Sequence, residues 1–220
     1  MSDSAAPRGS GEARDELLLR VRTALADHPA ISPIPRTYRR VTEPGTDVTA
    51  LFAERVSEYR ATVHRATADD LAGAIAGILA GRDVRRLVVP GGMPNAWLAA
   101  SDVERLGDDP PLASSALDQA DGVITGCAVA IAGTGTIVLD GGPGQGRRAL
   151  SLLPDYHLCV VEAQRIVGTV PEALALLRPA RPLTWISGPS ATSDIELNRI
   201  EGVHGPRTLD VVIIERPAQG

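Results

Sequence analysis

The sequence lacks lysine altogether, so all 22 of its basic residues are arginines, and aromatic residues make up only 3% of it. The 27 acidic residues outnumber the basic ones and give a net charge of −5. An overall positive charge of the kind that attracts nucleic acid is therefore absent, which leaves room only for a local basic patch. We expect no nucleic acid among the partners of this protein.

Cysteine is scarce as well. The two cysteines, Cys127 and Cys159, lie far apart in apolar runs, at no spacing that metal sites use. We expect two buried free thiols rather than a disulfide, which is consistent with a cytoplasmic location. Two thiols also fall short of the four that an ordinary iron–sulfur cluster needs, so we expect this chain to bind no metal and no cofactor of its own.

Long hydrophobic runs are missing too. The strongest ones, such as 87–90 and 127–132, are too short to span a bilayer, so we expect no membrane span. Residues 1–11 are polar and lack the apolar segment of a signal peptide. We interpret them as a disordered tail.

Aliphatic residues and turn formers are what the chain has in quantity. Hydrophobic residues make up 44% of it, and 22 glycines and 17 prolines indicate many short connections. This composition suits a sheet covered by helices rich in alanine and leucine. We expect three parts: the tail 1–11, an N-terminal helix with a proline-rich arm at 12–45, and a single domain at 46–216.

Hydrophobic periodicity predicts an alternation of helices and strands. Helices are expected at 12–26, 47–59, 68–80, 95–100, 114–120, 171–177 and 193–200. Strands are expected at 62–65, 86–89, 127–132, 136–140, 156–162, 183–187 and 209–215. The segments 127–132 and 136–140 flank Gly-Thr-Gly, which predicts a hairpin. The fold class is therefore α/β, with a layered, mostly parallel sheet and an antiparallel insertion.

Three glycine-rich loops are candidates for binding a ligand. In open α/β sheets ligands bind outside the carboxyl ends of the strands, and we expect the loops 91–92, 133–136 and 188–190 there. The third loop continues through several hydroxyl residues toward a predicted helix start. It is either an anion cradle of free amides and hydroxyls or a plain helix cap made by Ser193 and Glu196.

The candidate ligand contacts in these loops are polar or lack a side chain. We expect a small anion to be bound by Thr134, Gly135, Thr136, Gly188, Ser190, Thr192, Asp194 and Arg148. Arg147 and Arg148 end a glycine-rich loop that either closes over an anion or forms a solvated tip. The candidate for proton transfer is His204, whose neighbours are turn residues, and the alternative is an imidazole that stabilises the turn. His28, His64 and His157 have no second ligand at metal spacing.

Several segments in one order resemble the LUD domain family of lactate-utilisation proteins. They are Gly-Val-Ile-Thr-Gly-Cys at 122–127, Ala-Ile-Ala-Gly-Thr-Gly-Thr at 130–136, Leu-Ser-Leu-Leu-Pro-Asp-Tyr-His at 150–157, Ser-Gly-Pro-Ser through Glu at 187–196, and Gly-Val-His-Gly-Pro at 202–206. The resemblance implies a fold like that of the NagB/RpiA/CoA-transferase group. It also implies a role in oxidising L-lactate to pyruvate, with iron–sulfur clusters in partner subunits, and it implies no settled catalytic residue.

Two positions depart from the family's pattern. Gly133 stands where the family usually has glutamate, and Ala191 stands where it usually has arginine or lysine. If those two side chains face each other, Gly133→Glu alone destabilises the protein and adding Ala191→Arg restores it. The departures leave three functions open: an accessory component that binds a small carboxylate or partner subunits, a stand-alone enzyme acting on a sugar phosphate or acyl-CoA, and a regulatory ligand-binding module without catalysis.

Overall fold

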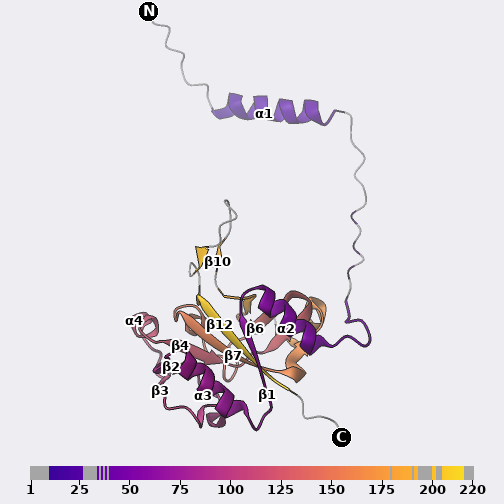
Figure 1. Ribbon diagram of the computed structural model, residues 1–220. Helices are drawn as coiled ribbons and strands as arrows, with labels where there is room; N and C mark the ends of the chain where they lie inside the picture. Colours follow the sequence, from indigo (N-terminus) through magenta and orange to yellow (C-terminus); the bar gives the residue numbers. More distant parts are fainter. Residues whose placement is uncertain are drawn as a thin grey trace, which may run out of the picture. The chain divides into compact units, whose positions relative to one another are not determined.

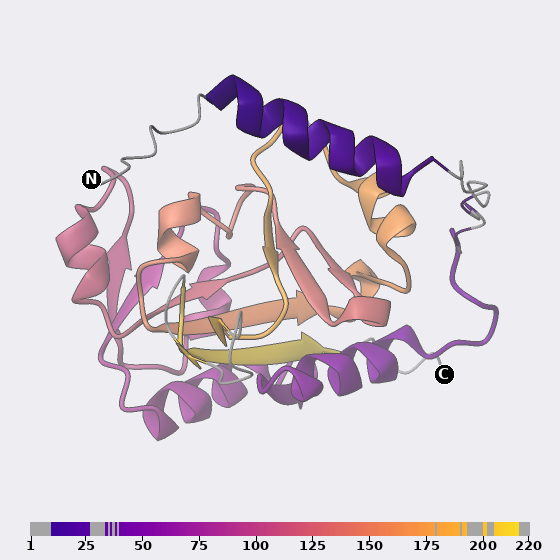
Figure 2. The same cartoon turned by 90° about the horizontal axis from the view of Figure 1, so that it is seen from above.

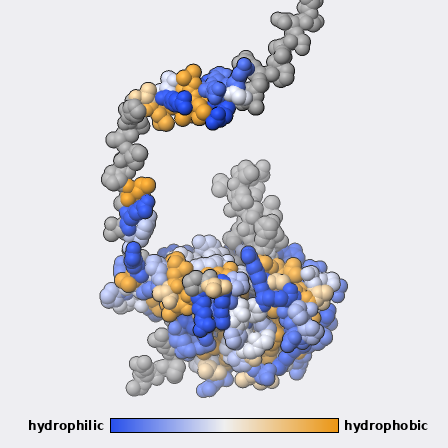
Figure 3. Space-filling model, turned by 180° about the vertical axis from the view of Figure 1, so that it is seen from behind, coloured by the Kyte–Doolittle hydropathy of each residue, from blue (hydrophilic) through white to orange (hydrophobic). Residues whose placement is uncertain are grey.

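The computed structural model describes residues 10–26, 34, 36, 38, 40–178, 180–189, 191–192, 200–201 and 205–215. The chain divides into two compact units, Met1–Tyr38 and Arg39–Gly220. In the first unit, helix α1 covers Ser10–Ala24. It begins two residues before the predicted start at residue 12, so Ser10 and Gly11, expected in the tail, belong to the helix. Its leucines Leu17 and Leu19 are exposed, and Figure 3 shows hydrophobic atoms beside hydrophilic ones along this helix.

The second unit is built on a parallel sheet of six strands in the order β1-β12-β7-β4-β2-β3. The strands are β1 (Thr62–Ala66), β2 (Arg86–Val89), β3 (Glu104–Gly107), β4 (Gly122–Thr125), β7 (Tyr156–Glu162) and β12 (Thr208–Ile214), several of which are labelled in Figure 1. The central strands β4 and β7 are almost wholly buried and apolar, as strands covered on both faces must be. The predicted mostly parallel sheet is confirmed.

A smaller, mixed sheet of four strands, in the order β8-β5-β6-β9, contains the predicted antiparallel insertion: β5, β6 and β9 pair antiparallel, and β8 pairs with β5 in parallel. Its strands are β5 (Val129–Ile131), β6 (Thr136–Leu139), β8 (Ile166–Val167) and β9 (Thr184–Ile186). β5 and β6 form the predicted hairpin, and the turn between them contains the short 3₁₀ helix η2 (Ala132–Thr134). Gly135 ends that turn with φ +57, and a Cβ there would lie 2.8 Å from the carbonyl carbon of Arg55, so the position requires glycine.

Helices cover the two sheets. They are α2 (Val48–Glu58), α3 (Leu71–Gly81), α4 (Ser114–Asp118) and α5 (Val170–Leu176), with 3₁₀ helices η1 (Asn95–Leu98), η3 (Arg148–Ser151) and η4 (Ala163–Arg165). α2 and the small sheet pack on one face of the large sheet, around Phe52, and α3 packs on the other face through Ile75. α5 covers the outer face of the small sheet. Figure 2 shows these helices outside the strands.

The end of the proline-rich arm is attached to the start of α5. Thr169 and Glu172 form a reciprocal capping box at this helix start. The Glu172 carboxylate also accepts hydrogen bonds from the backbone N–H and the hydroxyl of Thr42, at 2.9 and 2.6 Å. These hydrogen bonds lower the pKa of Glu172 to about 2, and the one from the Thr42 hydroxyl contributes most. The arm is therefore fixed to the second unit from Arg40, whose carbonyl accepts from Thr169, onward.

Several expected positions differ from those observed. Strands β3, β4 and β8 were not expected, since each is short and β3 carries charged residues. The predicted helix at 193–200 lies outside the described residues except for Ile200, which belongs to strand β11 (Ile200–Glu201), paired with β10 (Ala191–Thr192). The loop 91–92 does follow a parallel strand, but the loops at Gly133 and Gly188 follow strands of the small sheet, so that expectation was wrong for both.

Candidate functional site

A cavity of about 490 Å³ lies at the amino ends of β7 and β12, where the small sheet and η3 meet the large one. We name it the amino-end cavity. It is lined by Arg148, Ser151, Leu152, His157, Leu183, Thr184, Trp185, Ile186, Ser187, Gly188, Pro189, Pro206 and Leu209. Arg148 is the one charged residue among these, so the described walls carry a positive charge that no carboxylate in them balances.

Two of the predicted glycine loops meet through their hydroxyls, and one of them, at Ser187 and Gly188, lines this cavity. The Thr136 hydroxyl lies 2.8 Å from that of Thr134 and 2.8 Å from that of Ser187. Gly188 follows with φ +82, and a Cβ there would lie 2.5 Å from the Cβ of Tyr59. The close approach of this loop to the end of α2 therefore depends on glycine, and it places the Ser187–Gly188 backbone in the cavity wall.

The two neighbouring arginines have different roles. Arg147 is fixed by hydrogen bonds of 2.8 and 3.0 Å to the Asp108 carboxylate and by another to the Leu112 carbonyl. Arg148 lines the cavity, and its guanidinium forms no ion pair with any residue that the structure describes. A guanidinium without a carboxylate partner is suited to binding a carboxylate or phosphate, which it can do with two parallel hydrogen bonds.

His157 is the buried polar group of the cavity. It lies in β7 with a relative exposure of 1%, and its Nε2 is 2.7 Å from the Thr125 hydroxyl. Its Nδ1 forms no hydrogen bond within the described part of the chain. Burial lowers the pKa of the imidazole to about 4, so the ring is neutral near pH 7. A neutral imidazole with one free nitrogen is available for a hydrogen bond to a ligand.

A second cavity, of about 390 Å³, lies at the opposite end of the large sheet. We name it the carboxyl-end cavity. It lies beyond the carboxyl ends of the neighbouring strands β2 and β4, next to Gly92 and Gly126. The chain leaves these two strands toward opposite sides, and open α/β sheets usually bind ligands at such a point. Its charged residues, however, are paired. Arg181 donates to Asp140 at 2.7 Å, and Arg165 lies 3.4 Å from Glu162.

The structure places only part of the predicted site. Gly188 and Arg148 line the amino-end cavity. Thr134 and Thr136 do not line it and are linked to its wall only by the contact between the Thr136 and Ser187 hydroxyls, while Gly135 shapes the adjoining turn. Thr192 belongs to β10, but its side chain is not described. Ser190, Asp194 and His204 lie outside the described residues. Their predicted roles stay predictions.

His157 is the functional candidate that sequence reasoning passed over. Metal-ligand spacing, the only pattern that the sequence analysis applies to this residue, says nothing about hydrogen bonding. A usable signal was present, because β7 reads Tyr-His-Leu-Cys-Val-Val-Glu and a histidine inside such a buried run must find a polar partner.

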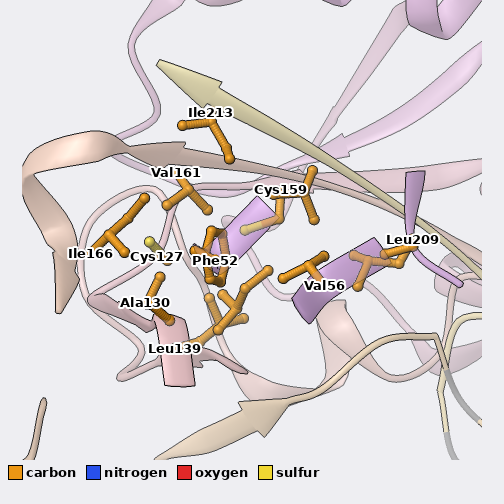
Figure 4. Close-up of a cluster of buried hydrophobic side chains, with 14 residues drawn as sticks. Phe52, Val56, Cys127, Ala130, Leu139, Cys159, Val161, Ile166, Leu209 and Ile213 are labelled. Carbon is orange, nitrogen blue, oxygen red and sulfur yellow. The ribbon is translucent and has the colours of Figure 1, made fainter. Parts of the chain in front are cut away.

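The described residues contain no group of three or more His, Cys, Asp or Glu side chains that could hold a metal ion. Cys127 and Cys159 are both free and lie among aliphatic side chains around Phe52, as Figure 4 shows. Burial raises the pKa of Cys159 to about 12 and that of Cys127 well above its ordinary value. Thiols held protonated in this way are poor ligands for iron. No helix among the described residues is long and apolar enough to cross a membrane.

Comparisons with known proteins agree on one family. A family model described as the LUD domain matches residues 49–214. The lactate utilization protein C of Deinococcus radiodurans is 46% identical over 213 residues, which cover 93% of this chain and 97% of that protein. Its counterpart in Halalkalibacterium halodurans is 35% identical over 106 residues, 44% of this chain and 46% of that protein.

A solved structure gives the same result. The crystal structure of a DUF162 family protein from Deinococcus radiodurans is similar to this chain with a TM-score of 0.65 and 44% sequence identity, over 83% of this chain and 100% of that one. The family model and the relative matched along nearly its whole length leave one conclusion: the chain belongs to the LUD domain family.

Proposed function

We propose that this protein is an accessory component of a cytoplasmic system that oxidises L-lactate to pyruvate. In this proposal it holds the small carboxylate in the amino-end cavity, while partner subunits carry the iron–sulfur clusters. The relatives named lactate utilization protein C support the lactate system. The buried, protonated thiols of this chain are consistent with electron transfer taking place in the partners.

The observation that carries the carboxylate site is the unpaired charge of Arg148. Arg148 lines a cavity whose other described walls are neutral and include Ser187 and Gly188. Arg148 is exposed, and a single carboxylate can pair with its guanidinium through two parallel hydrogen bonds. The cavity volume of about 490 Å³ leaves ample room for an acid of three carbons and for the water around it.

Isothermal titration of the full chain tests the site. L-Lactate should bind the unaltered protein, and Arg148→Gln should weaken that binding at least about tenfold, because a charge-assisted hydrogen bond pair is lost. Arg85→Gln is the matched control, since Arg85 is an exposed arginine just before β2 and outside the cavity. Lactamide, the neutral analogue, should not bind. Equal affinities of Arg148→Gln and Arg85→Gln for L-lactate would refute the site.

Purification tests the partner assignment. The tagged full chain, isolated under anaerobic conditions from cells growing on L-lactate, should bring down subunits with the visible absorbance of iron–sulfur clusters. A chain that purifies alone from such cells, in repeated mild preparations, would contradict the accessory role while leaving the carboxylate site to be judged by titration.

A further inference from the structure

A buried chain of hydrogen bonds runs from the amino-end cavity into the core. The His157 Nε2 lies 2.7 Å from the Thr125 hydroxyl oxygen. That hydroxyl lies 3.7 Å from the sulfur of Cys159, and the sulfur lies 3.8 Å from the carbonyl oxygen of Gly126. The latter two distances suit hydrogen bonds that involve sulfur, which are longer and weaker than those between oxygens and nitrogens.

The last acceptor fixes the direction of the whole chain. A carbonyl oxygen only accepts, so the Cys159 thiol donates its proton to Gly126. The thiol sulfur then accepts from the Thr125 hydroxyl, whose one proton is thereby used. With its proton directed to the sulfur, the same hydroxyl accepts from His157, which assigns the ring proton to Nε2; the 2.7 Å distance by itself fits either tautomer. The ring is left with a lone pair on Nδ1.

The surroundings keep every proton of this chain in place. Burial raises the pKa of the Cys159 thiol to about 12, although the hydrogen bond from Thr125 acts in the opposite direction, so the thiol remains a donor. Burial lowers the pKa of His157 to about 4, so the ring keeps one proton near neutral pH. Thr125 and His157 are both nearly inaccessible to solvent, at 0% and 1% relative exposure, so water does not compete for the hydrogen bond between them.

We propose that the amino-end cavity selects 2-hydroxy acids over 2-oxo acids because the Nδ1 of His157 can only accept a hydrogen bond. A 2-hydroxy acid presents an O–H donor to this lone pair while its carboxylate pairs with Arg148. A 2-oxo acid presents a carbonyl oxygen, a second acceptor, and leaves both lone pairs unsatisfied in a buried place. This selectivity rests on the proposed carboxylate site, and Thr125 and Cys159 act in it as positioning residues.

The tautomer is tested without any ligand. Long-range ¹H–¹⁵N spectra of the full chain labelled at histidine distinguish the protonated ring nitrogen from the unprotonated one. We expect the signals of His157, assigned by their loss in His157→Asn, to show Nε2–H. A proton on Nδ1 overturns the selectivity mechanism even if L-lactate binds.

Ligand preference is tested with a matched pair of variants remote from the ligand. We expect the unaltered protein to bind L-lactate about tenfold more tightly than pyruvate, the usual worth of one hydrogen bond to a neutral group. Cys159→Ser keeps a donor to Gly126 and an acceptor for Thr125, so the preference should persist. Cys159→Ala removes both and allows the Thr125 hydroxyl to reverse, so the preference should fall to near parity. Thr125→Val, which removes the hydroxyl at nearly equal volume, should do the same if Cys159→Ala does not fold.

The outcomes separate this selectivity from the proposed function. If neither acid binds, the carboxylate site itself fails, and the selectivity with it. If both acids bind with equal affinity in the unaltered protein, or if Cys159→Ala and Thr125→Val keep the full preference for L-lactate, the carboxylate site stands and the selectivity fails.

Discussion

Among the described residues, the arginines at one end of the large sheet are paired with carboxylates and the arginine at the other end is not. At the carboxyl ends of β2 and β4, Arg181 and Arg165 are each paired with a carboxylate. At the amino ends of β7 and β12, Arg148 has no such partner among the described residues and lines a cavity together with the buried, neutral His157. The topology of the sheet favours the first place for a ligand, and the chemistry of the side chains favours the second.

An internal ion pair and a ligand site are alternative uses of the same residue type, and the proposed function assigns one use to each end of the sheet. An arginine that already has a carboxylate contributes to folding, because removing it leaves that carboxylate poorly solvated. An arginine without one offers its binding capacity to a ligand.

Acid should destabilise the protein through the amino end first. The pKa of His157 is about 4 in the folded protein against 6.5 for an ordinary histidine, so the unfolded chain binds the proton more readily. Folding stability therefore falls as the pH drops from about 6.5 to 4, by about 3 kcal/mol for a shift of this size. Urea unfolding at several pH values should show this loss in the unaltered protein and a much smaller one in His157→Asn.

The carboxyl end should respond only at lower pH. Burial alone would raise the pKa of Asp140, but the hydrogen bonds from Arg181 and the Gly142 N–H outweigh it and hold that pKa below its ordinary 3.8. The contribution of this pair is present above pH 3.8 and lost below it. Arg181→Gln should therefore keep the acid response between pH 6.5 and 4, and its absence in that variant would contradict the assignment to His157.

Removing the two arginines should affect stability differently. Arg181→Gln should cost about 1–2 kcal/mol, because the Asp140 side chain is only 12% exposed and loses its cation. Arg148→Gln should change stability by less than about 0.5 kcal/mol, because Arg148 is exposed and pairs with no carboxylate in the part of the chain that the structure describes. Thermal or urea unfolding measures both. Equal losses in the two variants would remove the basis for treating the cavities as different.

Alanine substitutions of glycines at the two ends should also differ in their effect on stability. A Cβ on Gly133 would lie 2.8 Å from the carbonyl oxygen of Gly168, which the N–H of Gly133 holds at 3.0 Å, whereas a Cβ on Gly91 would meet nothing within 4 Å. Gly133→Ala should therefore cost about 1 kcal/mol or more and Gly91→Ala almost nothing. The same clash gives Gly133→Glu a cost of its own.

This result bears on the charge pair that the sequence suggests between positions 133 and 191. If Gly133→Ala is as destabilising as Gly133→Glu, the backbone clash explains the loss, and adding Ala191→Arg should not restore stability. A stable Gly133→Ala, with a Gly133→Glu that only Ala191→Arg repairs, would favour the paired charges instead.

The elements that the sequence predicted well are those whose signal is local. The β5–β6 hairpin follows from apolar runs on either side of Gly-Thr-Gly, and α5 follows from Pro171 at a helix start. The short strands β3 and β4 escaped prediction because they are strands through pairing with partners far away in sequence, which no local pattern records. Pairing in the large sheet, rather than propensity, makes them strands.

The site was predicted in part, for the same reason. Thr136 and Gly188 are recognisable as loop residues, but their meeting at the amino end depends on how the small sheet lies on the large one, which no local pattern records. The free charge of Arg148 and the paired charge of Arg147 look identical in sequence, since Asp108 is 39 residues away from Arg147. Tertiary pairing alone tells them apart.

One measurement decides between the two ends of the sheet directly. A crystal structure of the full chain with L-lactate should show the carboxylate within hydrogen-bonding distance of the Arg148 guanidinium and the hydroxyl beside His157. Density for the acid between Gly92 and Arg181 instead, with the amino-end cavity filled only by water, would contradict the account.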